Sequence, residues 1–96
     1  MKLLLIVYTG PHHQSVGELL DRNRIASYTW YAPAHGAGKS GRHEGNRAFP
    51  GEETVYFTMV PDEVAREVLP ALAAWQREAP QGERLHAAVM PVENFI

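Results

Sequence analysis

A glycine-rich and basic stretch, residues 33–51, holds most of the side chains in this chain that could bind a ligand. It contains five of the eight glycines and two of the five histidines. Three cations, Lys39, Arg42 and Arg47, outnumber the single acid Glu44. A connection of this length with no helical or strand period is usually a functional loop or a disordered one. The stretch is therefore the first candidate for a binding site.

Two glycines at the start of this loop favour an anion or a nucleotide as its ligand. Gly36 and Gly38 allow positive φ and a close approach of the backbone, and the N–H groups of such a turn can hold an anion. Lys39 and Arg42 follow them directly. A solvated hairpin tip is the alternative, because glycine and charge alone also produce one. The segment is not a Walker loop, since Pro33 stands where that motif needs a glycine and no helix can follow.

Histidines support a second hypothesis, a divalent metal site. His35 and His43, with the neighbouring Glu44, offer imidazole and carboxylate groups, which suit zinc, copper or nickel. His12 and His13 could contribute further ligands. The spacing matches no established local motif, and a lone loop histidine is usually exposed to solvent. The anion and the metal hypotheses therefore both stay open.

Catalytic patterns are missing from the sequence. It has no cysteine, no serine nucleophile turn with a histidine and an acid, and no pair of carboxylates in a recognisable pocket. The acidic residues gather instead on predicted helix surfaces. We therefore expect a protein that is not an enzyme.

Composition indicates one soluble domain over residues 1–96. Charged residues make up 21% and apolar residues 45%, and the net charge is -2. No basic stripe with interleaved aromatics is present, so nucleic-acid binding is not expected. The apolar run Leu3–Val7 is too short for a signal peptide, and no stretch is long enough to span a membrane. We expect a cytoplasmic protein.

Hydrophobic periodicity predicts the elements that must position the loop. Continuous or alternating apolar runs predict strands over residues 2–9, 25–32, 54–60 and 85–92. Helical spacing predicts one helix within residues 12–23 and a second that opens at Asp62, with Asp62 as its N-cap, and ends before Pro80. Pro70 predicts a kink in the second helix or its division into two.

This order, strand, helix, strand, strand, helix, strand, predicts an α+β fold of the ferredoxin-like type. Such a fold is a four-stranded antiparallel sheet with two helices on one face. The first strand is apolar on both faces, so it belongs in the middle of the sheet. The face that the helices leave open would also be apolar. An uncovered face of this kind predicts a homo-oligomer built face to face.

Three segments resemble the PII signalling family, and they follow one another in the family's order. Residues 36–43 (GAGKSGRH) are similar to the start of the family's T-loop. Residues 60–63 (VPDE), with Val64 and Val68, are similar to the junction before its second helix. Residues 89–93 (VMPVE), with Ile96, are similar to its closing strand. The resemblance in element order spans nearly the whole chain.

The resemblance implies a homotrimeric regulatory protein that binds a nucleotide in the clefts between subunits. Gly36, Gly38 and Lys39 would line this cleft, and Thr29 would lie near its floor. The loop 33–51 would change conformation with the ligand and dock on a partner protein. We expect its second half, Glu44–Gly51, to be mobile until a ligand or a partner orders it.

The chain also departs from the family pattern. Residues 79–84 (APQGER) stand where the family has a second glycine-rich segment with phosphate-binding cations, and only Arg84 could serve. The loop lacks the tyrosine and the glutamine that the resemblance would lead us to expect. The chain therefore resembles a divergent member whose ligand is a small anion, an adenine nucleotide being one candidate. The related CutA-like divalent-ion tolerance proteins share the trimer and the closing strand, and keep the metal hypothesis as the alternative.

Overall fold

The computed structural model describes residues 1–34, 36–38, 41–43 and 52–96. Its elements follow the predicted order, with one short ladder added inside the loop: β1 (Lys2–Thr9), α1 (His13–Arg22), β2 (Thr29–Ala34), β3 (Gly36–Gly38), β4 (Gly41–His43), β5 (Glu53–Val60), α2 (Asp62–Glu78) and β6 (Arg84–Pro91). The predicted fold class is confirmed.

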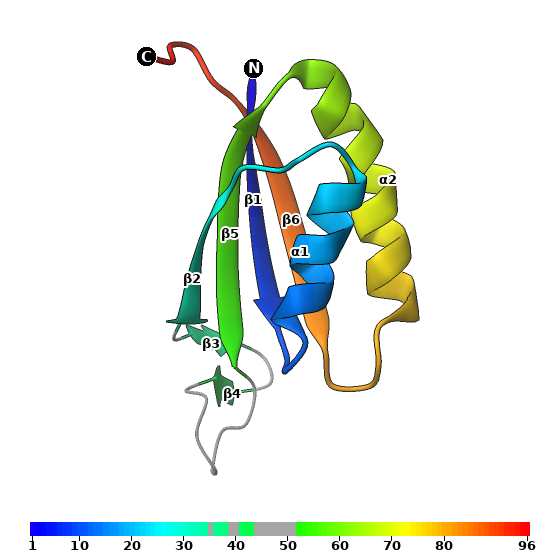
Figure 1. Ribbon diagram of the computed structural model, residues 1–96. Coiled ribbons are helices and arrows are strands. Elements are labelled where there is room, and N and C mark those ends of the chain that lie inside the picture. Colours follow the sequence, from blue (N-terminus) through cyan, green and yellow to red (C-terminus); the bar gives the residue numbers. More distant parts are fainter. Residues whose placement is uncertain (35, 39–40, 44–51) are drawn as a thin grey trace.

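The main sheet has the strand order β2-β5-β1-β6, and every neighbouring pair is antiparallel. β1 therefore lies in the middle, as its continuous apolar run predicts. Figure 1 shows α1 and α2 side by side on the same face of this sheet. The chain ends lie at one end of the sheet, and the short β3–β4 ladder lies beyond the other end (Figure 1). Neither described helix is long and apolar enough to cross a membrane.

The hydrophobic core fills the space between the sheet and the two helices. On β1 every second side chain points into it, so Leu4, Ile6 and Tyr8 are at most 1% exposed. The helices close the core with buried aliphatic side chains at helical spacing. These are Val16, Leu19 and Leu20 on α1 and Val64, Ala65, Val68 and Leu72 on α2.

The opposite face of the sheet is apolar, and neither helix covers it. Leu5, in the middle of β1, pairs with Phe57 on one side and with Ala88 on the other. Each is apolar, and the face continues with further apolar side chains on three strands. These are Leu3, Val7, Val55, Met59 and Met90. The uncovered apolar face that the sequence predicts is therefore present.

The beginning of β2 differs from its prediction. The strand starts at Thr29 instead of Ile25. Arg24 adopts a positive φ of 67°, and the Ile25 N–H donates a hydrogen bond to the Leu20 carbonyl at 2.9 Å. This turn closes α1 and drives the Ile25 side chain into the core, where it is 2% exposed. Ile25 and Tyr28 therefore contact the core from a turn, Ala26 and Ser27 are exposed, and the strand begins only at Thr29.

α2 is a single helix of 17 residues with Pro70 inside it, so its division into two helices is wrong. Pro70 lies on the exposed side of this helix, while Val68 and Leu72 on either side of it are buried. Asp62 is the first helical residue instead of the N-cap. Its carboxylate lies 2.7 Å from the amino group of Met1.

Candidate functional site

The glycine-rich segment begins with a small antiparallel ladder at one end of the main sheet. Gly36 pairs with His43, Ala37 with Arg42 and Gly38 with Gly41. The expectation of a stretch without strands is therefore wrong for this half of the loop. Backbone hydrogen bonds alone can hold such a ladder, so it leaves no side-chain period in the sequence.

Several predicted site residues are not among the residues that the structure describes. His35, Lys39 and residues 44–51 lie outside the described residues. For Gly36, Gly38, Arg42 and His43 the structure gives the strand and the register but no side-chain placement. The expectation that Glu44–Gly51 is mobile also lies outside the described residues.

A row of paired residues crosses the sheet at the end where the glycine-rich segment starts. Ala34 on β2 pairs with Glu53 on β5, Glu53 pairs with Thr9 on β1, and Thr9 pairs with Arg84 on β6. Neighbouring strands lie about 4.8 Å apart, so roughly 14 Å separates Ala34 from Arg84. Arg84 and the glycine-rich segment therefore occupy the same end of the sheet but opposite edges.

β2 reaches this end through an irregularity. Its register shifts between Tyr31 and Ala34, where one more residue stands on β2 than on β5. Pro33 lies in this interval and has no N–H to donate, which an edge strand tolerates. β2 makes one more pair after the bulge, at Ala34, and ends there.

Thr29 lies at the far end of β2 from the glycines. It pairs with Phe57, and its neighbourhood forms a cavity of about 330 Å³ that also includes Met59 and Phe95. Ala34 stands five positions after Thr29, which is about 17 Å of extended chain. The structure therefore does not bring Thr29 and Gly36 together within one subunit.

A buried polar cluster lies near the same end of the sheet, and no local pattern in the sequence predicts it. Tyr8 is fully buried, and its hydroxyl donates a hydrogen bond to the carboxylate of Glu83. The His12 N–H donates to the Tyr8 oxygen at 2.9 Å, and His12 Nδ1 lies 3.3 Å from both oxygens of Glu83. Burial, and then the hydrogen bond to Glu83, raise the pKa of Tyr8 far above its ordinary value.

This cluster joins the loop before α1 to the loop before β6. The side chain of Glu83 is only 6% exposed, so its charge is directed inward. The next residue after Thr9, Gly10, donates its N–H to the carbonyl of Glu52 at 2.8 Å, which ties the same corner to the end of the glycine-rich loop. Three connections therefore meet at one corner of the sheet. From the sequence alone, a glutamate in a turn such as Glu83 would be predicted to be exposed to solvent. Its partners cannot be recognised, because they lie far away in the chain.

The described histidines do not converge on a metal site. His12 faces Glu83, whereas His13 stacks on Trp30 with ring centroids 5.5 Å apart. His86 pairs with Val7 on β1 and is exposed. Among the residues described, no three histidine, cysteine or acidic side chains group together as metal ligands would. A site that uses His35 and His43 stays a prediction.

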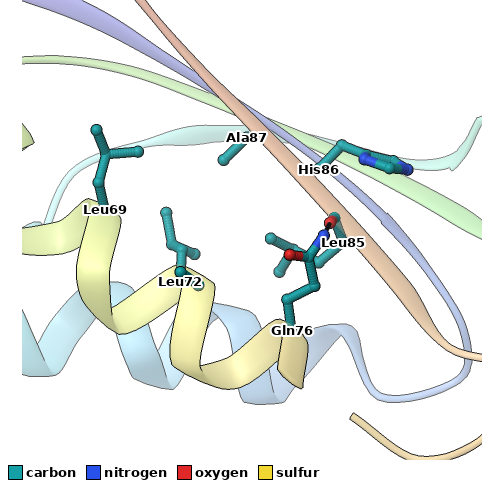
Figure 2. Close-up of a pocket in the computed structure, with 7 residues that line it drawn as sticks. Leu69, Leu72, Gln76, Leu85, His86 and Ala87 are labelled. Atoms are coloured by element: carbon teal, nitrogen blue, oxygen red, sulfur yellow. Dashed lines mark hydrogen bonds between the residues drawn. The ribbon is translucent and has the colours of Figure 1, made fainter. Parts of the chain in front are cut away.

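An apolar pocket of about 220 Å³ lies between α2 and the free edge of β6. Figure 2 shows Leu69 and Leu72 reaching from α2 toward the strand, while His86 points away from the helix. Gln76 donates a hydrogen bond to the Leu85 carbonyl at 2.6 Å and closes one end. No predicted ligand-binding residue lines this pocket, so it is separate from the candidate site.

Solved structures with the same fold include PII-like proteins. CPII from Thiomonas intermedia K12, a nitrogen regulatory PII-like protein bound to ADP, AMP and bicarbonate, superposes with a TM-score of 0.66 at 22% identity, over 94% of this chain and 93% of that one. A PII-like signalling protein from Thermus thermophilus superposes with a TM-score of 0.64 at 24% identity, over 92% and 82%. Likeness at this identity shows a shared fold.

A comparison of the sequence with family profiles identifies the family. No curated protein sequence matches the chain. The profile of the family described as nitrogen regulatory protein P-II, however, matches residues 1–95, which is nearly the whole chain. The predicted resemblance to this family is thereby confirmed for the chain as a whole. The chain belongs to the nitrogen regulatory protein P-II family.

Proposed function

We propose that this protein is a regulator without catalytic activity that binds a small anionic ligand between the subunits of a homotrimer. Proteins of the P-II family are regulatory, and the sequence offers no catalytic set of residues. An adenine nucleotide is the first candidate ligand. CPII, which shares the fold, is bound to ADP, AMP and bicarbonate in its solved structure.

The placement of Arg84 is the observation that carries this proposal. It lies at the same end of the sheet as the glycine-rich segment but on the opposite edge, roughly 14 Å away. One small ligand cannot easily contact both places on a single chain. In a ring of subunits, however, the β6 edge of one copy can approach the β2 edge of the next. The two halves of an anion site would then meet between copies.

The uncovered face of the sheet supports the trimer. Leu5, Phe57 and Ala88 form a continuous apolar centre that neither helix covers. A face of this kind on a small domain marks a contact between proteins, and homo-oligomers are closed by symmetry.

We assign the ligand contacts as follows. The N–H groups of Gly36 and Gly38 and the cations Lys39 and Arg42 would hold the anionic part from one subunit, and Arg84 would approach from the next. Thr29 would contact the other end of the ligand, because the length of β2 separates it from the glycines. Residues 33–51 would change conformation when the ligand binds and would dock on a protein partner in the cytoplasm.

Isothermal titration with ATP, ADP, AMP and bicarbonate tests the ligand. We expect binding of at least one, and a loss of at least ten-fold in affinity for Arg84→Gln. Arg77→Gln, which removes an exposed cation from α2, is the matched control and should bind as the unaltered protein does. No heat with any of the four at millimolar concentration would contradict the proposal.

A thermal-shift series separates the metal alternative. A ligand that binds only the folded state raises its apparent stability. Stabilisation by adenine nucleotides supports the proposal. Stabilisation by zinc, copper or nickel but not by nucleotides, lost in His35→Ala and His43→Ala, would replace it with the metal hypothesis.

A further inference from the structure

An aromatic and acidic pocket lies on the helix side of β2, away from the proposed ligand cleft. It has a volume of about 230 Å³ and lies between α1 and the first residues of β2. Trp30 and Tyr56 contribute rings from paired positions on two strands, and Tyr28 contributes a third ring from the turn before β2. Glu18 and Asp21 line it from α1. Thr29 points to the opposite face, so the pocket is independent of the proposed nucleotide site.

The rings are fixed by their neighbours. The Tyr56 hydroxyl donates a hydrogen bond to the His13 carbonyl at 2.5 Å, and the Tyr28 and Tyr56 rings lie 5.7 Å apart. The His13 ring stacks on Trp30 with an interplanar angle of 30°. These contacts hold the aromatic wall of the pocket in one arrangement before any ligand arrives, which lowers the cost of binding.

Gly17 makes room for this arrangement. A Cβ on Gly17 would stand 2.7 Å from the Tyr28 hydroxyl oxygen, which is closer than real Cβ contacts come. Glycine inside a helix costs about 1 kcal/mol relative to alanine. At this position the absence of a side chain lets Tyr28 pack against α1, where it closes one side of the pocket.

Both the rings and the acids favour a positively charged ligand. Glu18 and Asp21 stand three residues apart on α1, which makes them neighbours on the helix surface, and both are exposed. The face of an aromatic ring carries partial negative charge and attracts ammonium and guanidinium groups. No lysine or arginine is among the described residues that line the pocket. Arg24, close by in the sequence, pairs with Glu67 on α2.

The exposure of Trp30 is a further sign of a binding surface. It is 49% exposed, although its ring is large and apolar and could have been buried. Tryptophan at an exposed and ordered position is enriched at sites of recognition, where its ring stacks on a partner. Here the exposed ring lines the same pocket as two carboxylates.

From these contacts we propose that the pocket binds an ammonium or guanidinium group on an aliphatic stem. The charged group lies against Trp30 and pairs with Glu18 and Asp21, and the stem packs on the tyrosine rings. Such a group occurs on free alkyl amines and on the lysine and arginine side chains of proteins. The chemistry is the same in both cases, and the experiment separates the two sources.

The test uses the indole N–H resonance of Trp30 in the full-length protein. Trp75→Phe identifies this resonance by leaving one indole signal, and Trp30→Phe in the unaltered background identifies it by its loss. We titrate butylammonium and butylguanidinium, with butanol as the neutral comparison. We expect saturable shifts of the Trp30 signal with both cations and no saturable shift with butanol.

Charge-neutral variants establish the role of the acids. Glu18→Gln combined with Asp21→Asn should weaken cation binding at least ten-fold. Glu63→Gln, which removes an exposed carboxylate from α2, should leave it unchanged. A short uncharged peptide with one central arginine then separates the sources. Binding at least ten-fold tighter than butylguanidinium indicates a protein side chain, and equal or weaker binding indicates a free cation.

Three results would overturn the proposal. Butanol could shift Trp30 as strongly as the cations, which would make the pocket merely apolar. The double variant could bind cations as well as the unaltered protein does. Finally, acrylamide could fail to quench Trp30 fluorescence in the Trp75→Phe protein, which would mean that another subunit covers the ring.

Discussion

The hydroxyl of Tyr28 occupies the space that a side chain on Gly17 would need, 2.7 Å from the expected Cβ position. Gly17→Ala should therefore gain less than the roughly 1 kcal/mol that alanine normally adds to a helix interior. In the Tyr28→Phe background the nearest ring atom is 3.8 Å away, so the same change should recover most of that gain. Urea denaturation of the four proteins measures both effects.

This double-mutant cycle contains its own control. If Gly17→Ala changes the free energy of unfolding equally in both backgrounds, the two residues are not coupled and the close contact is not real. The cycle also reports on the cation pocket, because Tyr28 forms one of its walls.

Glu83 should be the acidic residue that matters most for stability. Its buried carboxylate accepts the hydrogen bond of Tyr8, so Glu83→Ala leaves the Tyr8 hydroxyl without an acceptor inside the protein. We expect a loss of about 1–3 kcal/mol in the free energy of unfolding. Glu83→Gln keeps an acceptor in place and should lose less than half as much. Chemical denaturation at pH 7 measures both.

Glu78 is the matched control for Glu83, because the two residues line one pocket of about 220 Å³ at the end of α2 but Glu78 is exposed. Glu78→Ala should change the free energy of unfolding by less than about 0.5 kcal/mol. If Glu78→Ala and Glu83→Ala lower the free energy of unfolding equally, the Tyr8–Glu83 hydrogen bond does not contribute measurably to stability.

Alkaline pH should destabilise the protein through Tyr56. Burial raises the pKa of Tyr56 to about 12 from its ordinary value near 10. Between these values the folded chain keeps the phenolic proton and the unfolded chain loses it, so the free energy of unfolding falls as pH rises from 10 to 12. Tyr8, whose pKa is raised in the same direction, adds to this fall.

Tyr56→Phe isolates the contribution of Tyr56. The variant loses the hydrogen bond to His13 at every pH, but it has no proton to release. Its stability should therefore decline less steeply between pH 10 and 12 than that of the unaltered protein. Denaturation midpoints at pH 8, 10 and 11 give the two slopes, and parallel slopes would show that Tyr56 does not titrate in the unfolding reaction.

The sequence predicts the fold well because local patterns agree with one another. The continuous apolar run of β1 indicates a central strand, and the alternation in β5 separates Tyr56 from Phe57 correctly. Errors arise where tertiary contacts override a local signal. The local pattern predicts Ile25 to be a strand residue, but it packs in the core after a turn. Pro70 predicts a break, but it lies on the exposed side of one continuous helix.

The candidate site is predicted less completely, for two physical reasons. Composition identifies the glycine-rich segment, but its position across the sheet from Arg84 depends on strand order, which no local pattern encodes. Contacts such as Tyr8–Glu83 join residues 75 positions apart, and both residue types have ordinary local explanations. The helical glycine, Gly17, is the one signal that could have pointed to the pocket beside Tyr28.

Assembly should depend on the open face of the sheet. Leu5 lies at its centre, between Phe57 and Ala88, and a carboxylate there would be buried without a partner in any face-to-face contact. Leu5→Asp should therefore convert the proposed trimer into a monomer of 10.7 kDa in light scattering after size exclusion. Ala73→Asp places the same charge on the exposed surface of α2 and should leave the trimer intact.

Met59→Glu is a second test of the same face, and it is needed in case Leu5→Asp does not fold. Met59 lies on the same face but is already 40% exposed, so the folded chain tolerates a charge there more easily. Circular dichroism confirms that each variant is folded. If both variants fold and still form the same assembly as the unaltered protein, the open face is not the interface, because a buried and unpaired carboxylate costs several kcal/mol in each subunit.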